Sequence, residues 1–319
     1  MNDAKHVQGN SHTIHSRHQH MSWDKSRPPA IHIAPGDTVD FRDIDAMCGQ
    51  ITRESKVDVL GNIDFARVNP IAGPVYVDGA EPGDTLKVTL LEFEPSGWAW
   101  TGVIPEFGLL AEDFPKPALH IWSYDRTFAT PAAFGKFARV PLKPFCGTTG
   151  VAQSEPGSHS TIPPYATGGN MDIRDLGEGV ELHLPVQVKG ALYSIGDPHA
   201  AQGDGEVCGT AIESPMSVRT RIELVKGGNL KFPRFVCPRP VSRHLDAKGY
   251  DVTTGIGPDL MEASKNAVRG MIDLLGKTRG LSAENAYMLC SVCADLRISE
   301  IVDRPNWVVS CYLPRIVFE

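Results

Sequence analysis

Alternating apolar and polar positions dominate the first three quarters of the chain, which is the pattern of half-buried β-strands. Short strands are expected at Ile31–Ile33, Thr38–Phe41, Val75–Val77 and Leu86–Leu90. Two longer alternating stretches, Val180–Tyr193 and Val207–Val225, predict long strands on either side of a compact polar loop. Residues 95–170 are irregular and rich in glycine, proline and aromatic residues, so they predict long loops that serve a site or cover a core.

The pattern changes to helical spacing after about residue 240. Apolar residues recur on one face of Asp259–Lys277, with Pro258 before this stretch and Gly280 after it. Ser282 has the character of an N-cap and predicts the start of a second helix. Val308–Leu313 reads as a closing strand. The sequence therefore predicts a β-rich chain with a pair of helices near its C-terminal end.

Composition narrows the class of protein. The 319 residues suggest two or three domains, and 31 glycines with 25 prolines indicate many turns. A net charge of -7 argues against nucleic-acid binding, which needs basic surface. No apolar run approaches the roughly 18 residues of a membrane span, and the polar N-terminus does not resemble a signal peptide. Seven cysteines without a pairing pattern suit a reduced, cytoplasmic location.

The densest group of chemically reactive side chains lies in Gly196–Glu206. Within this stretch Asp197, Asp204 and Glu206 supply carboxylates, His199 supplies an imidazole and Gln202 an amide, separated by glycine and alanine. Carboxylates at this density repel one another unless a cation neutralises them, and a mixed set of Asp, His and Glu suits zinc or another first-row ion. A polar hairpin loop with solvated acids is the alternative. The strong strands on both sides favour a rigidly held site.

Other segments carry weaker signals. Asp43–Gln50, which includes Asp45, and Gly168–Asp172, which includes Asn170, have a similar acidic or glycine-rich character, although each alone fits a plain turn. Cys290 and Cys293 are expected to be buried core residues on a helix, and Trp98 and Trp100 structural aromatics. The histidines at positions 6, 12, 15, 18 and 20 predict a solvated or oligomer-contacting arm. Nucleophile-elbow, Walker and dinucleotide-binding motifs are absent.

Several of these segments resemble the acetamidase/formamidase family over nearly the whole chain, from about Ser22 to Phe318. The matching stretches are Pro35–Val39, Asp45–Ala46, Gly49–Gln50, Asn69–Pro70, Gly73–Val77, Gly79–Asp84, Gly168–Asp172, Leu184–Val186, Gly190–Ser194, Gly196–Asp197, His199–Glu206, Gly209–Glu213 and Asp295–Ile298. The resemblance implies hydrolysis of small linear amides, formamide or acetamide, to ammonia and a carboxylate. It also implies a homo-oligomer and a bound divalent metal, most readily zinc, with calcium as the alternative.

The resemblance further implies a mainly β fold in three parts. These are a jelly-roll-like β-sandwich over residues 1–95, a second, barrel-like β part over 96–240 that carries the Asp/His/Glu loop, and a small α/β part over 241–319. No cysteine or serine nucleophile is implied.

Amide hydrolysis needs a nucleophile, stabilisation of the oxyanion and a proton for the leaving amine. We expect His199, Asp45 and Asp197 to bind the metal, with Asp172 as a further ligand. Glu206 is the expected general base and Asp204 the reserve for either role. Asn170 and Gln202 are expected to orient the substrate amide, since a carboxamide offers both a donor and an acceptor.

The sequence leaves two rival functions open. A relative of the same family could open γ-lactams, which contain a cyclic version of the same bond. Alternatively, a metal-stabilised β-protein could bind small amides without cleaving them. Ammonia release from formamide separates the last possibility from the others.

Overall fold

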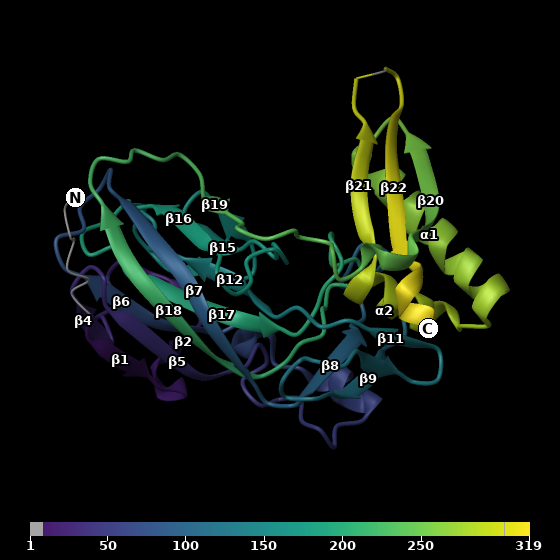
Figure 1. Ribbon diagram of the computed structural model, residues 1–319, viewed down its shortest axis with the longest axis horizontal. Helices are drawn as coiled ribbons and strands as arrows, with labels where there is room; N and C mark the ends of the chain where they lie inside the picture. The colour runs from purple at the N-terminus through teal and green to yellow at the C-terminus, as the bar shows by residue number, and fades with distance from the viewer. Residues whose placement is uncertain (1–8, 303) are drawn as a thin grey trace.

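Two large sheets form the body of the protein in the computed structural model, which describes residues 9–302 and 304–319 (Figure 1). The first sheet has the order β1-β5-β18-β7-β16-β19. Its strands are β1 (Ser11–Ile14), β5 (Thr38–Ile44), β18 (Met216–Val225), β7 (Thr85–Pro95), β16 (Glu181–Pro185) and β19 (Arg234–Val236). β1 runs parallel to β5, and the other neighbours are antiparallel.

The second sheet has the order β14-β15-β12-β17-β6-β2, and β4 also pairs with β6 in parallel. Its strands are β14 (Pro164–Tyr165), β15 (Gly168–Asn170), β12 (Phe145–Gly150), β17 (Tyr193–His199), β6 (Ile71–Val77), β2 (Gln19–His20) and β4 (Ile31–Ile33). Three small pairs accompany the two large sheets: β8 (Trp98–Val103) with β9 (Ala118–Ser123), β10 (Ala132–Phe134) with β11 (Ala138–Val140), and β3 (Ser22–Trp23) with β13 (His159–Ser160).

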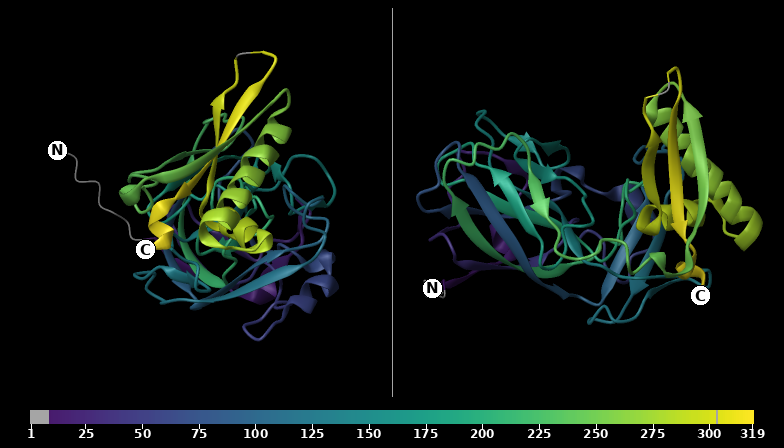
Figure 2. Two further views of the ribbon diagram at one scale, coloured as in Figure 1. Left: turned by 90° about the vertical axis from the view of Figure 1, so that its right-hand side faces the viewer. Right: turned by 45° about the horizontal axis from the view of Figure 1, so that its top comes forward.

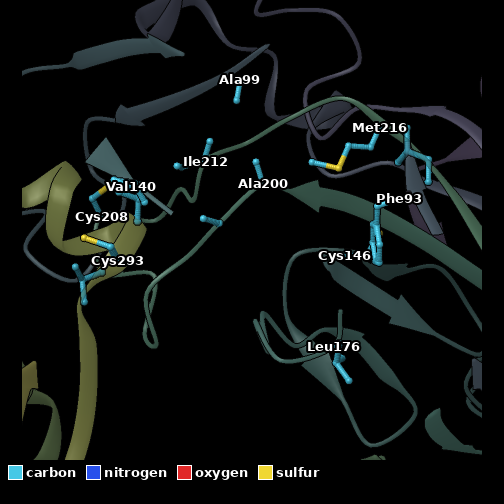
Figure 3. Close-up of a cluster of buried hydrophobic side chains, with 14 of the residues drawn as sticks. Phe93, Ala99, Val140, Cys146, Leu176, Ala200, Cys208, Ile212, Met216 and Cys293 are labelled. Atoms are coloured by element: carbon cyan, nitrogen blue, oxygen red, sulfur yellow. The ribbon is translucent and has the colours of Figure 1, made fainter. Parts of the chain in front are cut away.

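A continuous hydrophobic core joins the two sheets to the C-terminal part. Between the sheets, the ring of Phe41 on β5 meets Tyr193 on β17 edge-on, with centroids 6.0 Å apart. Figure 3 follows the core along the segment between Ala200 and Met216 as far as Cys293 in the C-terminal part. This segment therefore ties the β body to the last part of the chain through buried side chains.

The C-terminal part is a three-stranded sheet covered by helices and stands apart from the two large sheets (Figures 1 and 2). Its strands, in the order β20-β22-β21, are β20 (Tyr250–Gly257), β22 (Trp307–Pro314) and β21 (Asp295–Glu300). Helix α1 spans Leu260–Arg279 and α2 spans Ala283–Cys293. Gly255 allows α1 to lie directly on β20, because a Cβ there would come within 1.9 Å of the carbonyl oxygen of Ala263. Short 3₁₀ turns occur at Ser16–His18 (η1), Val57–Asn62 (η2), Phe65–Arg67 (η3), Asp246–Lys248 (η4) and Arg315–Phe318 (η5).

Both predicted helices are confirmed, including both ends of the first and the start of the second. The side chain of Asp259 accepts a hydrogen bond from the backbone N–H of Glu262 at the start of α1, and Gly280 ends the helix with a left-handed φ of 65°. Ser282 caps α2 in the same way, through the N–H of Asn285. The closing strand is also present as β22.

The mainly β class is confirmed, and among the described residues the sheets do not close into a barrel. Strands from residues 1–95 and from residues 96–240 share both large sheets: β18 lies between β5 and β7. The residues after 241 have a separate sheet and the two α-helices. The domain boundaries at 95 and 240 themselves stay a prediction.

Several strand predictions were wrong in extent. Val180–Tyr193 is interrupted after Pro185, and the next strand starts only at Tyr193. Of the stretch Val207–Val225, only Met216–Val225 is a strand. The apolar residues at 207–212 are buried in a loop, so their alternation reflects burial rather than strand geometry. Residues 95–170 contain β8 to β15 instead of long loops alone.

The N-terminal histidines match the expected solvated arm only in part, since His15 is exposed but His20 is buried, and contact with another subunit stays a prediction. His6 lies outside the described residues. His12 accepts or donates a 2.9 Å hydrogen bond with Asp37 beside β1, and His20 on β2 is buried. Within the described residues no helix is both long and apolar enough to cross a membrane. All seven cysteines are free, and Cys290 and Cys293 are buried on α2 as expected.

Candidate active site

His199 at the end of β17 is the centre of the candidate site. Its side chain is fully buried, and the ring of Phe145 meets it edge-on with centroids 4.9 Å apart. Its Nε2 lies 3.2 Å from a carboxylate oxygen of Asp197, on the same strand, and 3.2 Å from one of Glu213. Asp197 and His199 are therefore strand residues of the second sheet, whereas the sequence had placed them on a loop tip. Residues two apart on a strand face the same side, which explains why both carry the chemistry.

Two further carboxylates complete the cluster. Asp172, just after β15, groups with Asp197 and His199, while Glu206 groups with His199 and Glu213; in each group the candidate ligand atoms lie within 4.8 Å of one another. We call Asp172, Asp197, His199, Glu206 and Glu213 the His199 cluster. It combines four carboxylates with one imidazole, drawn from four separate segments of the chain.

Gly147 on β12 makes room for this cluster. A Cβ at this position would lie 2.4 Å from Oδ1 of Asp172, 2.7 Å from Oδ2 of Asp197 and 3.0 Å from the His199 ring. Contacts under 3.0 Å are essentially forbidden, so any other residue here would push the carboxylates apart. Gly147 thus leaves β12 without a side chain at the point where the strand passes the charged groups.

Three carboxylates of the cluster have a left-handed backbone. The φ angles are 48° at Asp172, 55° at Asp197 and 43° at Glu206, and Asn69 beside them has 54°. Such conformations cost a non-glycine residue of order 1 kcal/mol or more and concentrate at functional sites. The surrounding structure therefore holds these side chains in directions that an ordinary strand or turn would not give.

Mutual repulsion and burial shift the protonation equilibria of the cluster. Burial, reinforced by the charge of Asp197, raises the pKa of Asp172 to about 7. Burial and the charge of Asp172 raise the pKa of Glu206 well above its usual range. Burial would lower the pKa of His199, but the carboxylates of Glu213 and Asp197 outweigh it and raise this pKa well above 6.5. Clusters of perturbed groups beside a cavity are typical of active sites.

The donor set fits a divalent metal ion. Oδ1 of Asp172, Oε2 of Glu213 and both ring nitrogens of His199 are buried and form no well-aligned hydrogen bond with the described residues, although Nε2 lies close to two of the carboxylates. No lysine or arginine is among the groups that shift the pKa of Asp172 or Glu206. A cation would satisfy the unpartnered atoms and neutralise the excess negative charge, and imidazole with carboxylates suits zinc or another first-row ion. The need for a metal and its identity stay predictions.

A pocket of about 200 Å³ opens beside the cluster. Asp197, Glu206, Glu213, Asn170 and Asn69 contribute polar groups to its wall, and most of the remaining wall is apolar. A larger hollow of about 740 Å³ lies between α1 and residues 113–116, but no residue of the His199 cluster lines it. The smaller pocket is therefore the candidate substrate site, since it brings an apolar cavity together with convergent titratable groups.

Asn170 is held so that its amide nitrogen stays available. Its Oδ1 accepts hydrogen bonds from the Thr148 hydroxyl at 2.5 Å and from Nδ2 of Asn69 at 3.1 Å. With the oxygen engaged, the NH₂ group is the part of this side chain that can donate to a molecule in the pocket. Asn170 thus lies where a residue that orients a substrate carbonyl must lie.

The other predicted residues lie around the cluster and have different contacts. The Asp45 carboxylate accepts the backbone N–H groups of Met47 at 3.2 Å and Gly49 at 2.5 Å, so it closes its own turn. Burial, opposed by these hydrogen bonds, raises its pKa. Gln202 donates to the backbone oxygen of Asp172 at 2.8 Å and supports that residue from behind.

Asp204 points away from the cluster towards Arg174. Its carboxylate lies 3.4 Å from Nε of Arg174 and is about half exposed. Arg174 in turn donates to Asp295, with Nη2 2.9 Å from Oδ2, in a buried ion pair. Burial, opposed by Arg174, raises the pKa of Asp204. The geometry assigns Asp204 to a network that joins β21 to the segment carrying the cluster.

The C-terminal part contacts the segment around residues 203–206, which carries Glu206, through backbone hydrogen bonds. The N–H of Gly203 donates to the backbone oxygen of Ser291 on α2 at 2.8 Å. The N–H of Leu296 donates to the backbone oxygen of Asp204 at 2.9 Å. A Cβ at Gly203 would lie 2.0 Å from the carbonyl oxygen of Ala294, so only glycine allows the approach. The C-terminal part therefore helps to position Glu206.

Glu213, Asn69 and Gly147 were not among the predicted site residues. Glu213 pairs with His199 in an isolated antiparallel bridge, and its other oxygen accepts the N–H of Ala211 at 2.8 Å. Both Asn69–Pro70 and Gly209–Glu213 lie in stretches that carry the family resemblance. That signal could have pointed to Glu213 and Asn69, whereas nothing in the sequence singled out Gly147.

Comparisons with known proteins identify the family of the chain. The model of the acetamidase/formamidase family matches residues 5–159 and 153–319, which together span nearly the whole chain. The chain belongs to this family. The formamidase of Methylophilus methylotrophus is 27% identical over 368 aligned residues, covering 94% of this chain and 89% of that protein. The acetamidase of Mycolicibacterium smegmatis is 27% identical over 344, covering 85% and 84%. Membership makes the chain an amide-hydrolysing hydrolase.

Solved structures show the same fold. A gamma lactamase from Delftia acidovorans superposes with a TM-score of 0.87 at 26% identity, covering 95% of this chain and 90% of that one. A predicted acetamidase/formamidase from Thermoanaerobacter tengcongensis gives 0.68 at 31% identity, covering 96% of both chains.

Proposed function

We propose that the enzyme hydrolyses small primary amides such as formamide or acetamide to ammonia and a carboxylate, and that the His199 cluster carries out the reaction. The observation that carries this proposal is the cluster itself: four carboxylates and a buried imidazole beside a pocket that Asp197, Glu206, Glu213 and Asn170 line. Membership of the family supplies the reaction class.

Asp172, Asp197 and His199 are the residues that would hold a divalent ion. Such an ion would lower the pKa of a bound water molecule and polarise the amide carbonyl. Amide hydrolysis needs both effects, because a neutral amide is a poor electrophile. Asp45, expected as a ligand from the sequence, has its carboxylate engaged with its own turn, and Asp172 takes that role in this proposal.

Glu206 is the proposed proton carrier. Its raised pKa means that the carboxylate has a high affinity for a proton, so it takes one from the attacking water and returns it to the leaving nitrogen. Asn170 donates from its NH₂ group to the carbonyl oxygen, where negative charge develops in the transition state. Glu213 keeps the imidazole of His199 oriented through its 3.2 Å contact.

The test is ammonia release from formamide and acetamide by the purified protein, with His199→Ala as the site variant and His183→Ala as its control. His183 lies on β16 in the other sheet and lines neither the pocket nor the cluster. We expect the wild type and the His183→Ala control to hydrolyse both amides. We expect the His199→Ala variant to hydrolyse neither. Absence of ammonia release with every amide tested would overturn the proposal.

A second candidate function is γ-lactam opening. The observation that favours it is the superposition with the gamma lactamase from Delftia acidovorans, at a TM-score of 0.87. Ring opening by the same residues would leave the amine attached to the product and would release no ammonia. Product analysis with a γ-lactam beside a linear amide therefore separates the two functions.

A further inference from the structure

The pocket beside the His199 cluster is larger and more apolar than a one-carbon or two-carbon amide requires. Trp100, Ile104, Met47 and Val68 form part of its wall, and the first three have exposed fractions of 2%, 5% and 3%. These side chains form one hydrophobic group with Leu60 and Ile51, so this part of the wall belongs to the core, whereas Phe65, Phe107 and Ile162 on the rest of the wall are exposed.

The volume sets the size of the group that fits. The pocket measures about 200 Å³. A cavity of about 150 Å³ lined by Leu, Ile and Phe accommodates benzene. Formamide and acetamide have only three and four non-hydrogen atoms and would leave most of this wall in contact with water. The pocket therefore has room for a ring of about six carbons next to the amide.

The charges around the pocket select a neutral substrate. No lysine or arginine lines it, while Asp197, Glu206 and Glu213 do. An anionic substrate would find no lysine or arginine to pair with and would lose hydration at the apolar wall.

We propose that the preferred substrate is a primary amide whose acyl group is a branched or cyclic apolar group of about six carbons. This inference rests on the proposed function, because a primary amide that yields ammonia carries its only substituent on the carbonyl carbon. In the reaction the water oxygen bonds to that carbon and the C–N bond breaks. The nitrogen leaves as ammonia after gaining a proton, and the apolar group remains in the pocket on the carboxylate.

The first test compares cyclohexanecarboxamide with isobutyramide. Both have a singly branched carbon next to the carbonyl, so their intrinsic reactivity is similar and the comparison reports on the pocket. We expect kcat/KM to be at least about tenfold higher for cyclohexanecarboxamide, since even one methylene group in a hydrophobic pocket is worth about tenfold or more. Equal or lower kcat/KM for the larger amide would overturn the inference.

An isomeric substrate tests which side of the amide enters the pocket. N-cyclohexylformamide has the same atoms as cyclohexanecarboxamide, but its ring is attached to nitrogen and hydrolysis releases cyclohexylamine. We expect it to be hydrolysed at least about tenfold more slowly than cyclohexanecarboxamide. Faster hydrolysis of this isomer would mean that the pocket holds the amine side, which contradicts the inference.

A larger side chain in the pocket should reduce the preference of the enzyme for the larger amide. Val68 lines the pocket and is half-buried, whereas Val57 on η2 is exposed and does not line it. Val68→Phe should reduce the ratio of kcat/KM for cyclohexanecarboxamide to that for isobutyramide by at least about tenfold. Val57→Phe, the matched control, should leave this ratio unchanged. An unchanged ratio in folded Val68→Phe protein would count against the assignment of this pocket.

Binding measurements separate failure of this inference from failure of the proposed function. If no amide is hydrolysed, the proposed function fails, but calorimetry on the wild-type protein still compares the dissociation constants of the two amides. Binding of cyclohexanecarboxamide at least about tenfold tighter than isobutyramide would support the apolar subsite. Equal dissociation constants would overturn it, even in an active amidase.

Discussion

Nε2 of His199 lies 3.2 Å from Oε2 of Glu213, and the two residues face each other across an isolated antiparallel bridge. Both side chains are buried, so this contact holds the imidazole in a fixed orientation inside the cluster. The relationship gives Glu213, which sequence reasoning had left without a role, a place beside the centre of the site.

Glu213→Gln should therefore impair catalysis. The substitution keeps the shape of the side chain but removes its negative charge from His199, and we expect kcat to fall by about 10²-fold. Ammonia release measures this effect, and circular dichroism checks the fold. Glu223→Gln, on the exposed side of β18 where Glu223 pairs with Lys87, is the matched control and should retain full activity. Unimpaired turnover in Glu213→Gln would show that the contact is only structural.

Glu206→Gln and His199→Ala should separate proton transfer from metal binding. Glu206→Gln should keep the metal and the fold and lose turnover by about 10²–10⁴-fold, the usual contribution of a positioned acid–base group. His199→Ala should lose both metal and activity, because it removes a ligand atom. Elemental analysis beside the ammonia assay distinguishes the two results. Metal loss in Glu206→Gln together with metal retention in His199→Ala would reverse the roles.

Cys48→Ala and Cys146→Ala should each retain most of the turnover. Burial raises the pKa of both thiols, so neither supplies a thiolate at neutral pH. Cys146 is nearest to the site, on β12 next to Gly147. Steady-state assays and mass spectrometry of protein mixed with substrate check this expectation. A trapped thioester, or loss of activity in a folded variant, would point to nucleophilic catalysis by cysteine.

The sequence predicted the reaction class and part of the site, and the reasons differ between residues. Asp197, His199 and Glu206 were found because they lie within one short polar segment. Asp172 was predicted from a separate glycine-rich segment and Glu213 was missed, because the meeting of these segments depends on how β17, β15 and the loop before β18 are arranged in three dimensions. Asp204 was selected for its proximity in sequence, but the tight turn at Gly205 directs it to Arg174 instead.

In the fold as well, local features could be predicted from the sequence and long-range features could not. The ends of α1 and α2 could be predicted because capping by Asp259, Gly280 and Ser282 is a local interaction. The extent of β18 could not, because residues 207–215 have the apolar alternation of a strand yet are buried in a loop against α2 and β8. Sheet order depends on pairing between distant segments, which no local pattern records.

The contribution of His20 to the stability of the protein should fall as the pH drops from about 6.5 to 4. Burial lowers the pKa of His20 to about 4, despite its 2.8 Å hydrogen bond with the backbone oxygen of Ser22. The unfolded chain therefore binds a proton at a higher pH than the folded chain, and neutral His20 stabilises the fold fully above pH 6.5. This stabilisation, about 3 kcal/mol, is lost as the pH falls through that window.

Urea unfolding at several pH values measures the contribution of His20. His20→Gln should be less sensitive to pH between 6.5 and 4 than the wild type, whereas His32→Gln, at an exposed position, should behave like the wild type. The same pH sensitivity in His20→Gln and the wild type would assign the acid destabilisation to other groups.

We propose that the His199 cluster holds a divalent ion and that amide hydrolysis in this protein depends on that ion. The most direct measurement removes the ion with a chelator, determines the remaining metal by elemental analysis and follows ammonia release from acetamide before and after adding zinc or another first-row ion. We predict that the metal-free protein is inactive and that activity returns in proportion to the metal bound by the wild type, with no metal regained by His199→Ala. Full activity in protein that elemental analysis finds to be metal-free would contradict the account.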